Sequence, residues 1–193
     1  AAVQRIEKQR IPGILVEAGV AMGGSAIVMA MTKARTRPLH LYDVFELLPP
    51  PGDKDDDQSQ ATYEAFRKGE VTGLTNLNYI KHSNDLMDFV IENMNRFQIT
   101  SEREHIFFHK GIFQDTLIID KTVAFAHIDC DWHDSVVTCI ERISPYIALG
   151  GIILFDDYNS FSGCRKAVDE WLSVNKNFKI IHKDWTLAVK RVA

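Results

Sequence analysis

Short apolar runs rich in β-branched residues alternate with amphipathic stretches along the chain. The apolar runs predict strands at residues 14–17, 39–43, 106–110, 123–129 and 152–156. Between them, apolar residues at helical spacing predict helices at residues 23–36, 84–97, 134–146 and 161–174. Strands that alternate with helices are typical of a parallel sheet with helices on both faces. The pattern therefore predicts an α/β fold.

Two segments depart from this alternation. "FKIIHKDWTLAVKR", residues 178–191, holds two strand-like runs around a polar turn, which predicts an antiparallel hairpin at the edge of a mostly parallel sheet. "PPPGDKDDDQSQ", residues 49–60, combines three prolines with four aspartates, which predicts neither helix nor central strand. We expect a mobile loop over residues 46–60. It is either a solvated surface excursion or a lid, since it follows the carboxyl end of the second strand.

The composition is that of one globular domain over residues 1–193, with 46% hydrophobic and 25% charged residues. A formal charge of -4 and a pI near 6.0 leave no broad basic surface, which argues against a nucleic-acid partner. The longest apolar stretches reach about ten residues, well short of the roughly 20 that a membrane-spanning helix needs. We therefore expect no membrane partner.

The cysteines and the first residues bear on the cellular setting. Cys130, Cys139 and Cys164 lack the spacing of a metal or disulfide motif, and no secretory leader pattern opens the chain. Both observations indicate a cytoplasmic protein. The chain begins "AAVQRIEKQRIPG", without Met, and reaches its first strand within about fourteen residues. We interpret residues 1–12 as the short remnant of an N-terminal segment.

A glycine-rich turn joins the first strand to the first helix in "ILVEAGVAMGGSAIVMA". Glycine there lets the backbone approach a ligand, and the following helix offers free N–H groups. The turn lacks the G-x-G-x-x-G pattern of a dinucleotide site, but Asp43 ends the second strand, where an acid accepts hydrogen bonds from ribose. A ribose without a pyrophosphate fits S-adenosylmethionine. Its amino-acid tail is expected near Glu17 and the turn residues Gly19, Gly23, Gly24 and Ser25.

Carboxylates gather at the ends of two predicted parallel strands. Asp129 closes one strand, and Asp156 and Asp157 close the next, so the three can meet at one edge of the sheet. Anionic oxygen ligands suit hard cations, which predicts Mg²⁺, with Mn²⁺ or Ca²⁺ as alternatives. His127 lies on the same side of its strand as Asp129, either behind the ligands or as an ordinary buried histidine. Aspartates can also cap helices, which we expect for Asp134.

A divalent ion beside a methyl sulfonium has a specific use. It can chelate an acceptor hydroxyl and a neighbouring oxygen, lower the pKa of that hydroxyl and align it with the S–CH₃ bond. Asp129 can assist as a general base. The sequence thus predicts methyl transfer to a hydroxyl of a sugar-like or other vicinal-diol small molecule.

The glycine turn and the acidic cluster belong to a longer set of motifs between roughly residues 12 and 172, which includes "PGILVEAGVAMGGSA", "YDVFELLPPP", "HKGIFQDTL", "HIDCDWHDS" and "GGIILFDDY". Together they resemble the macrocin O-methyltransferase family, whose members methylate sugar hydroxyls of macrolide and aminocoumarin natural products. The resemblance implies a class I S-adenosylmethionine-dependent methyltransferase with a Rossmann-like sheet. It implies a divalent metal, usually Mg²⁺, at Asp129, Asp156 and Asp157, with Asp129 as the base. It also implies cofactor contacts at Glu17, Gly19, Ser25, Asp43, Gly111, Ile112 and Phe113.

The chain departs from the family pattern at Ala18, Val44, Leu47 and His133, where the family usually has Cys, Ser, Gly and Tyr. The first three are packing changes near the cofactor. His133 lies one turn from Asp129 and can alter recognition of the acceptor. In this family an N-terminal segment also helps to close over the acceptor, and almost none is present here. That points to a truncated chain, or to a more open pocket with a different substrate.

Other functions remain open from the sequence alone. The same oxygen-rich site would chelate a catechol, so a phenolic acceptor is the main variant. A hydrolase that activates water would need a basic residue for phosphate, a place for which Lys110 and Arg165 are candidates. A non-catalytic protein that binds S-adenosylmethionine is a third class. A homo-oligomer is also open, because Trp171, Phe178 and Trp185 can either pack on the sheet edge or form an interface.

Overall fold

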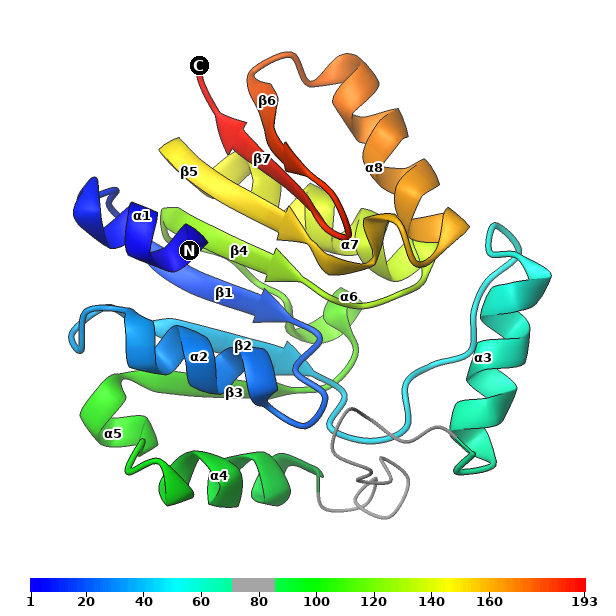
Figure 1. Ribbon diagram of the computed structural model, residues 1–193, viewed down its shortest axis with the longest axis horizontal. Helices are drawn as coiled ribbons and strands as arrows, with labels where there is room; N and C mark the ends of the chain where they lie inside the picture. The colour runs from blue at the N-terminus through cyan, green and yellow to red at the C-terminus, as the bar shows by residue number, and fades with distance from the viewer. Residues whose placement is uncertain (71–85) are drawn as a thin grey trace.

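A computed structural model describes residues 1–70 and 86–193. Its seven strands form one sheet in the order β3-β2-β1-β4-β5-β7-β6 (Figure 1). β1 to β5 are parallel, and β7 pairs antiparallel with β5 and β6, which confirms the predicted hairpin at the sheet edge. The strands are β1 Ile14–Ala18, β2 Leu39–Asp43, β3 Ile106–Lys110, β4 Val123–Ile128, β5 Ile147–Phe155, β6 Phe178–Lys183 and β7 Leu187–Arg191.

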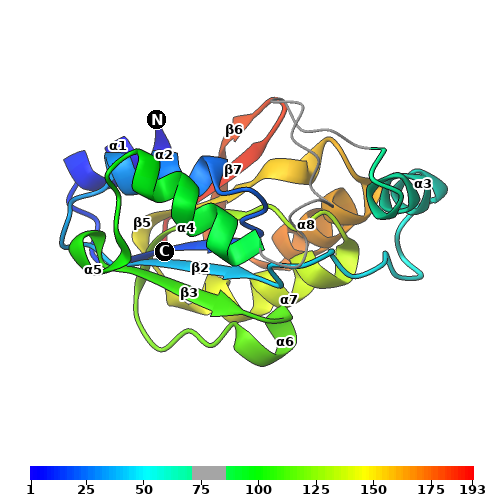
Figure 2. The same ribbon diagram turned by 90° about the horizontal axis from the view of Figure 1, so that it is seen from below.

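Helices cover both faces of the sheet (Figure 2). α1, α2 and α4 pack on one face and α7 and α8 on the other, whereas α3 lies beyond the carboxyl ends of the strands (Figure 1). The helix predicted at residues 84–97 is α4, although residue 84 lies outside the described residues. The helices are α1 Ala2–Lys8, α2 Gly24–Thr32, α3 Asp57–Arg67, α4 Leu86–Arg96, α5 Ser101–Glu104, α6 Phe113–Thr116, α7 His133–Ile143 and α8 Ser162–Val174. Within the described residues, none is long and apolar enough to cross a bilayer.

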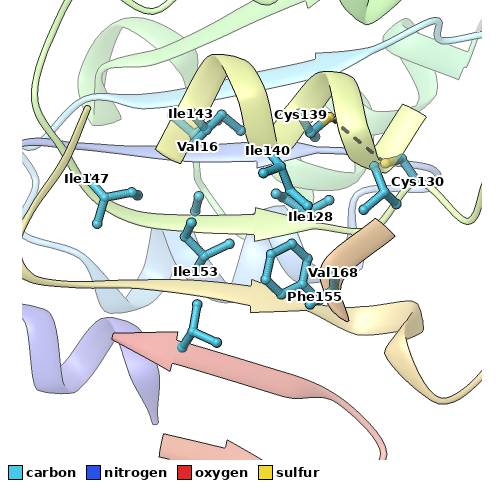
Figure 3. Close-up of a cluster of buried hydrophobic side chains, with 14 of the residues drawn as sticks. Val16, Ile128, Cys130, Cys139, Ile140, Ile143, Ile147, Ile153, Phe155 and Val168 are labelled. Atoms are coloured by element: carbon cyan, nitrogen blue, oxygen red, sulfur yellow. Dashed lines mark hydrogen bonds between the residues drawn. The ribbon is translucent and has the colours of Figure 1, made fainter. Parts of the chain in front are cut away.

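The core forms two layers because successive strand residues face opposite sides of the sheet. In β1, Leu15 packs toward α1, α2 and α4, while Val16 packs toward α7 and α8. Figure 3 shows the second layer, where Ile140 and Ile143 of α7 lie over the sheet and Val168 of α8 lies beside Phe155 of β5. Both faces of the central strands are therefore buried, as the continuous apolar runs predict.

The N-terminal residues form a helix that the sequence did not predict. That residues 1–12 are the remnant of a longer N-terminal segment stays a prediction, and Val3 and Ile6, one turn apart on α1, are buried against the sheet. Arg37 ties the helix down, since its Nε donates to Glu7 Oε1 at 2.7 Å. α1 is therefore an integral part of the domain.

The acidic segment at residues 46–60 is only partly a loop. Residues 57–60 form the first turn of α3, so the prediction of no helix is wrong there. The reason is local capping, because Asp56 Oδ1 accepts a hydrogen bond from Ser59 N at 2.9 Å. Asp57 in the first turn and Arg67 in the last also suit the helix dipole. The mobility of the remaining loop stays a prediction.

The strand β5 begins earlier than predicted. α7 ends at Ile143, a single 3₁₀ turn follows at Ser144–Tyr146, and the chain enters the sheet at Ile147. Leu149, Gly150 and Gly151, which follow the helix predicted at residues 134–146, lie inside this strand. Gly150 takes a φ of 82° there, and the register with β4 shifts between Val123 and Phe125. The glycine permits a β-bulge. Because glycine is common both after a helix and at a bulge within a strand, the sequence alone does not distinguish the two.

The aromatic residues near the C-terminus divide into two groups. Trp171 and Phe178 pack against each other with ring centroids 4.7 Å apart, so both follow the alternative of packing at the sheet edge. Trp185, in the turn of the hairpin, is 82% exposed and therefore does not pack on the sheet edge. A homo-oligomer stays a prediction.

The turn after β1 brings the site together. Gly19 has a φ of 91°, and a Cβ there would lie 1.6 Å from the backbone oxygen of Asp129. The two chain segments are also hydrogen-bonded, since Asp129 N donates to Ala18 O at 2.8 Å. Gly19 is therefore needed for the approach of the turn to the end of β4, whereas a Cβ at Gly24 would meet open space.

This contrast gives a matched pair of variants. Gly19→Ala should lower the free energy of unfolding by about 3 kcal/mol or more, because it adds both a clash and backbone strain. Gly24→Ala, at the start of α2, should leave it unchanged or raise it by up to about 1 kcal/mol. Urea denaturation followed by circular dichroism measures both. Wild-type stability in Gly19→Ala would contradict the close approach.

Candidate functional site

A first cavity of about 130 Å³ opens where β1, β2 and β4 end. It brings Gly19, Asp43 and Phe113, three of the predicted cofactor residues, together with the predicted base Asp129. Its apolar walls come from Leu48, Phe66, Phe113 and Trp132. The combination of aromatic faces and carboxylates suits a ligand with a flat ring and several hydrogen-bond donors.

Asp43 is engaged with the protein backbone. Its Oδ2 accepts from Val20 N at 2.7 Å and from Ala21 N at 3.0 Å, and its Oδ1 accepts from Phe45 N at 2.7 Å. Burial raises the pKa of the carboxyl group, although these N–H donors favour its charged form. Asp43 therefore shapes the glycine turn, a role that the sequence did not indicate.

The remaining predicted cofactor residues surround this turn. Gly23 has a φ of 85° and precedes α2, so its left-handed backbone starts the helix. Gly24 and Ser25 form the first turn of α2. Gly111 N donates to Asp43 O at 2.9 Å, and Ile112 next to it is exposed. Glu17 differs from the others because it is fully buried.

The segment before α3 is docked on two helix starts. Asp55 Oδ1 accepts from His133 N, the first residue of α7, at 2.9 Å. Asp56 accepts from Ser162 Oγ, the first residue of α8, and Trp132 Nε1 donates to Pro49 O at 2.9 Å. α7 and α8 have no side-chain cap of their own at the preceding residue. Asp55 therefore caps α7, and Asp56 binds the side chain of the first residue of α8, although both helices are far away in the sequence.

Part of the acidic cluster predicted from the sequence comes together. Ligand atoms of Asp129 and Asp156 lie within 4.8 Å of one another, with His127 rather than Asp157 as the third member of this group. Asp157 is buried beside them, where its Oδ2 accepts from Asp131 N at 3.1 Å. These oxygen donors could hold a hard divalent cation. Asp134, for which we expected a capping role, instead pairs with His133, and its Oδ1 lies 2.8 Å from the ring Nδ1.

His127 connects two of the carboxylates. Its Nδ1 lies 2.9 Å from Glu17 Oε1, and its Nε2 lies 3.5 Å from Asp156 Oδ1. Burial disfavours the charged ring, but the hydrogen bonds to Asp156 and Glu17 outweigh it and raise the pKa of His127 to about 10.

The aspartates hold their protons more tightly than usual. Burial, followed by the nearby charge of Asp157, raises the pKa of Asp129 to about 8. Burial also raises the pKa of Asp157 to about 6, although the N–H of Asp131 opposes this. A cation in the cluster would relieve the same repulsion, so the residues present fit a metal ion.

A second cavity, of about 320 Å³, lies between α1, α2, β4 and β5. Val28 and Met29 of α2 and Phe125 and Leu154 of the sheet give it apolar walls. His127 and Asp156 line it as well, and so do Gly24 and Ser25. The acidic cluster therefore separates the two cavities, with Asp129 on the first and Asp156 on the second.

Sequence reasoning missed several residues of the first cavity. Leu48 and Phe66 reach it only because the segment around α3 folds back over the strand ends. Trp132 and Asp131 follow Asp129 directly, so their closeness to the acidic motif was the available signal. Asp131 also has a φ of 58°, a left-handed backbone that turns the chain sharply after β4.

These shifts predict how pH affects the metal-free protein. The folded state binds more protons than the unfolded chain at Asp129 between about pH 4 and 8, and at His127 between about pH 6.5 and 10. Because the folded state holds the extra protons, its stability should fall as pH rises through these ranges. Thermal unfolding with excess EDTA at pH 5, 7 and 9 should give decreasing midpoints. Asp129→Asn should flatten the trend up to pH 8, and midpoints that increase with pH would contradict the assignment.

Comparisons with known proteins agree with this architecture. The profile of the macrocin-O-methyltransferase (TylF) family matches residues 1–191. The chain is 29% identical over 175 residues to 8-demethyl-8-(2,3-dimethoxy-alpha-L-rhamnosyl)-tetracenomycin-C 4'-O-methyltransferase of Streptomyces olivaceus, covering 88% of this chain and 61% of that protein. It is 28% identical over 176 residues to demethyldecarbamoylnovobiocin O-methyltransferase of Streptomyces niveus, covering 88% and 62%. The chain thus spans about three fifths of the length of these relatives.

Solved structures share the fold. The O-methyltransferase NovP matches with a TM-score of 0.80 at 24% identity, covering 100% of this chain and 77% of that one. The calicheamicin methyltransferase CalS11 matches with a TM-score of 0.69 at 16% identity, covering 98% and 76%. This likeness confirms the predicted Rossmann-like methyltransferase sheet. Because the family profile covers almost the whole chain, and both the fold and the order of the motifs agree, the chain belongs to the macrocin-O-methyltransferase (TylF) family.

Proposed function

We propose that this chain transfers a methyl group from S-adenosylmethionine to a hydroxyl of a sugar-like or other vicinal-diol small molecule. A divalent cation, Mg²⁺ in the first place, would be held by Asp129, Asp156 and Asp157. The observation that carries the proposal is the position of the acidic cluster between two cavities. Donor and acceptor would approach the cluster from opposite sides.

The first cavity suits the donor. Phe113 and Trp132 offer ring faces for an adenine, and Asp43 lies where the ribose of such a donor would be. The backbone of Gly19 remains for the amino-acid tail. Phe66 and Leu48 narrow the cavity to about 130 Å³, so we infer that the segment around α3 shifts when the donor binds.

Asp129 is the proposed base. It lines the donor cavity and also belongs to the acidic cluster, so its carboxylate is placed to take the proton of an acceptor hydroxyl. A bound divalent ion would supply Lewis-acid activation of that hydroxyl. The hydroxyl oxygen bonds to the methyl carbon while the C–S bond breaks, which leaves a methyl ether and S-adenosylhomocysteine.

The second cavity suits the acceptor. Its walls are mostly apolar, and His127 and Asp156 are among its polar lining residues, which fits a hydroxylated ring attached to an apolar body. The names of the relatives agree, since one describes methylation at the 4' oxygen of a rhamnosyl-tetracenomycin. A catechol is the main alternative acceptor, because the same cluster would chelate its two oxygens.

The basic residues weigh against a hydrolase. Lys110 pairs with Glu46 at 2.8 Å, and Arg165 NH2 donates to Asn159 Oδ1 at 2.9 Å. Both candidates for phosphate binding therefore already have other partners. Three free buried cysteines also agree with a reducing, cytoplasmic setting for the reaction.

Calorimetry tests the proposal directly. S-adenosylmethionine should bind with and without Mg²⁺, and methyl transfer to a panel of glycosides and catechols should need the ion. A hydrolase predicts no binding of the donor, and a non-catalytic protein predicts binding without turnover. Either result would remove the proposed activity.

Asp129→Asn and Asp156→Asn should each lower kcat by at least about 100-fold, because one removes the base and both remove an ion ligand. Affinity for S-adenosylmethionine should stay within a few fold in both. Asp134→Asn, an exposed acid on α7, is the control and should keep its activity. Full activity in Asp156→Asn would refute the metal site.

Asp43→Ala should weaken binding of S-adenosylmethionine, but the structure adds a second effect. The variant loses three acceptor contacts to backbone N–H groups, so its melting temperature should fall as well. Calorimetry on the folded fraction separates the two effects. Unchanged donor affinity in a folded variant would remove Asp43 from the donor site.

A further inference from the structure

We propose that Tyr158 is a positioning residue, which holds the turn that carries Asp156 and Asp157 in the orientation that a divalent ion needs. The inference rests on the proposed function, because it presumes an ion at these carboxylates. Asp156, Asp157 and Tyr158 form one 3₁₀ turn directly after β5, so two of the three proposed ligands lie on a segment of three residues. The position of this turn therefore sets how its carboxylates meet Asp129.

The turn is too short to hold its own shape. A single 3₁₀ turn has few internal hydrogen bonds, and their geometry is poorer than in an α-helix. The side chain of Asp156 is 44% exposed, so a loose backbone beneath it would let the carboxylate sample several orientations. The orientation of the two ligands therefore depends on contacts between the turn and other elements.

Tyr158 makes such contacts from the last position of the turn. Its side chain is 3% exposed and belongs to the core layer beneath α7 and α8. Its hydroxyl donates to Asp169 Oδ1 of α8 at 2.8 Å and accepts from Lys183 Nζ of β6 at 3.2 Å. One phenol thus ties the turn to a helix and to the hairpin at the sheet edge.

Two cations contact the same ring. Arg165 Cζ lies 5.6 Å from the ring centroid of Tyr158 and Lys183 Nζ lies 5.0 Å from it, and both distances are within the range of cation–π attraction. Arg165 Nε also donates to Tyr158 O at 3.2 Å. Arg165 therefore holds both the backbone and the ring of the residue that ends the turn.

Strand pairing places the hairpin beside the turn. Phe155, the last residue of β5, is the register partner of Leu187, the first residue of β7, so the hairpin turn lies next to the end of β5 (Figure 1). Asn159 Nδ2 donates to Asp184 O within that hairpin turn. Tyr158 itself lines neither of the two cavities of the proposed site. It therefore acts through the turn, and not on the donor or the acceptor.

The test uses Mn²⁺ as the probe, because electron paramagnetic resonance measures its free concentration. Tyr158→Phe keeps the buried ring and removes the hydroxyl, so it should weaken Mn²⁺ binding by about 3- to 10-fold, less than the loss of a direct partner of a ligand. Asp169→Ala removes the same contact from α8 and should weaken binding in the same way. The double variant should lose little more than Tyr158→Phe alone, because both changes break one contact.

Tyr42→Phe is the matched control. It removes the hydroxyl of another buried tyrosine, which donates to Ile118 O at 3.5 Å in the segment between α6 and β4. Neither residue belongs to the acidic cluster, so Mn²⁺ binding should stay at the wild-type value. Saturating Mn²⁺ should restore most of kcat in Tyr158→Phe, which a purely structural defect would not allow. Asp169 is exposed, so Asp169→Ala gives the answer if Tyr158→Phe folds poorly.

The outcomes separate the inference from the function. If the wild type binds no Mn²⁺, the proposed ion site fails and this inference fails with it. If the wild type binds Mn²⁺, and Tyr158→Phe and Asp169→Ala bind it equally well, the positioning role is wrong while the ion site stands. An equal loss of Mn²⁺ affinity in Tyr42→Phe would indicate a general loosening of the fold and would also overturn the role of Tyr158.

Discussion

Repulsion among carboxylates at one edge of the sheet is the constraint on which this molecule depends. Asp129, Asp156 and Asp157 meet there, and none of the Lys or Arg side chains in the described part of the chain lies within ion-pair distance of them. The repulsion between such carboxylates can be relieved by protonation, by a bound cation or by a buried positively charged side chain. His127 provides the last of these for Asp156 and Glu17. The pKa values of the other two carboxyl groups are raised in the metal-free protein, to about 8 for Asp129 and about 6 for Asp157, and a bound cation would reverse this rise.

The fold maintains this arrangement through its backbone rather than through the cluster itself. β1, β4 and β5 are neighbours, so the residues that end them share one edge. Gly19 allows the β1 turn to approach Asp129, and the hydrogen bond from Asp129 N to Ala18 O fixes the end of β4. Two buried layers of apolar side chains hold the strands from both sides. The stability of the apolar core thus offsets the repulsion among the carboxylates. Such compensation is common at functional sites.

The sequence predicted what local patterns determine. Strand runs, the glycine turn and the acids at strand ends gave the sheet and the cluster, because each depends on neighbours in the chain. The contact between Glu17 and His127 could not be predicted, since it requires the register of two strands separated by most of the domain. α1 was missed because two buried residues in a seven-residue helix carry too weak a period. The role of Asp55 was hidden for a similar reason, because the helix it serves begins at His133.

The hydrogen bonds of residues 49–56 to the starts of α7 and α8 explain how this acidic, proline-rich segment can cover a site without a hydrophobic core of its own. Asp55 takes the capping position that α7 lacks locally, and a lost cap costs about 1 kcal/mol. Asp56 accepts instead from the side-chain hydroxyl of Ser162 at the start of α8, an exposed hydrogen bond that adds less. Opening the segment therefore costs at least about 1 kcal/mol, which leaves at most roughly a sixth of the molecules open at equilibrium. Phe66 and Leu48 narrow the donor cavity in the docked state. A donor that needs more room must bind the open state better by at least that free energy, so these contacts reduce its apparent affinity.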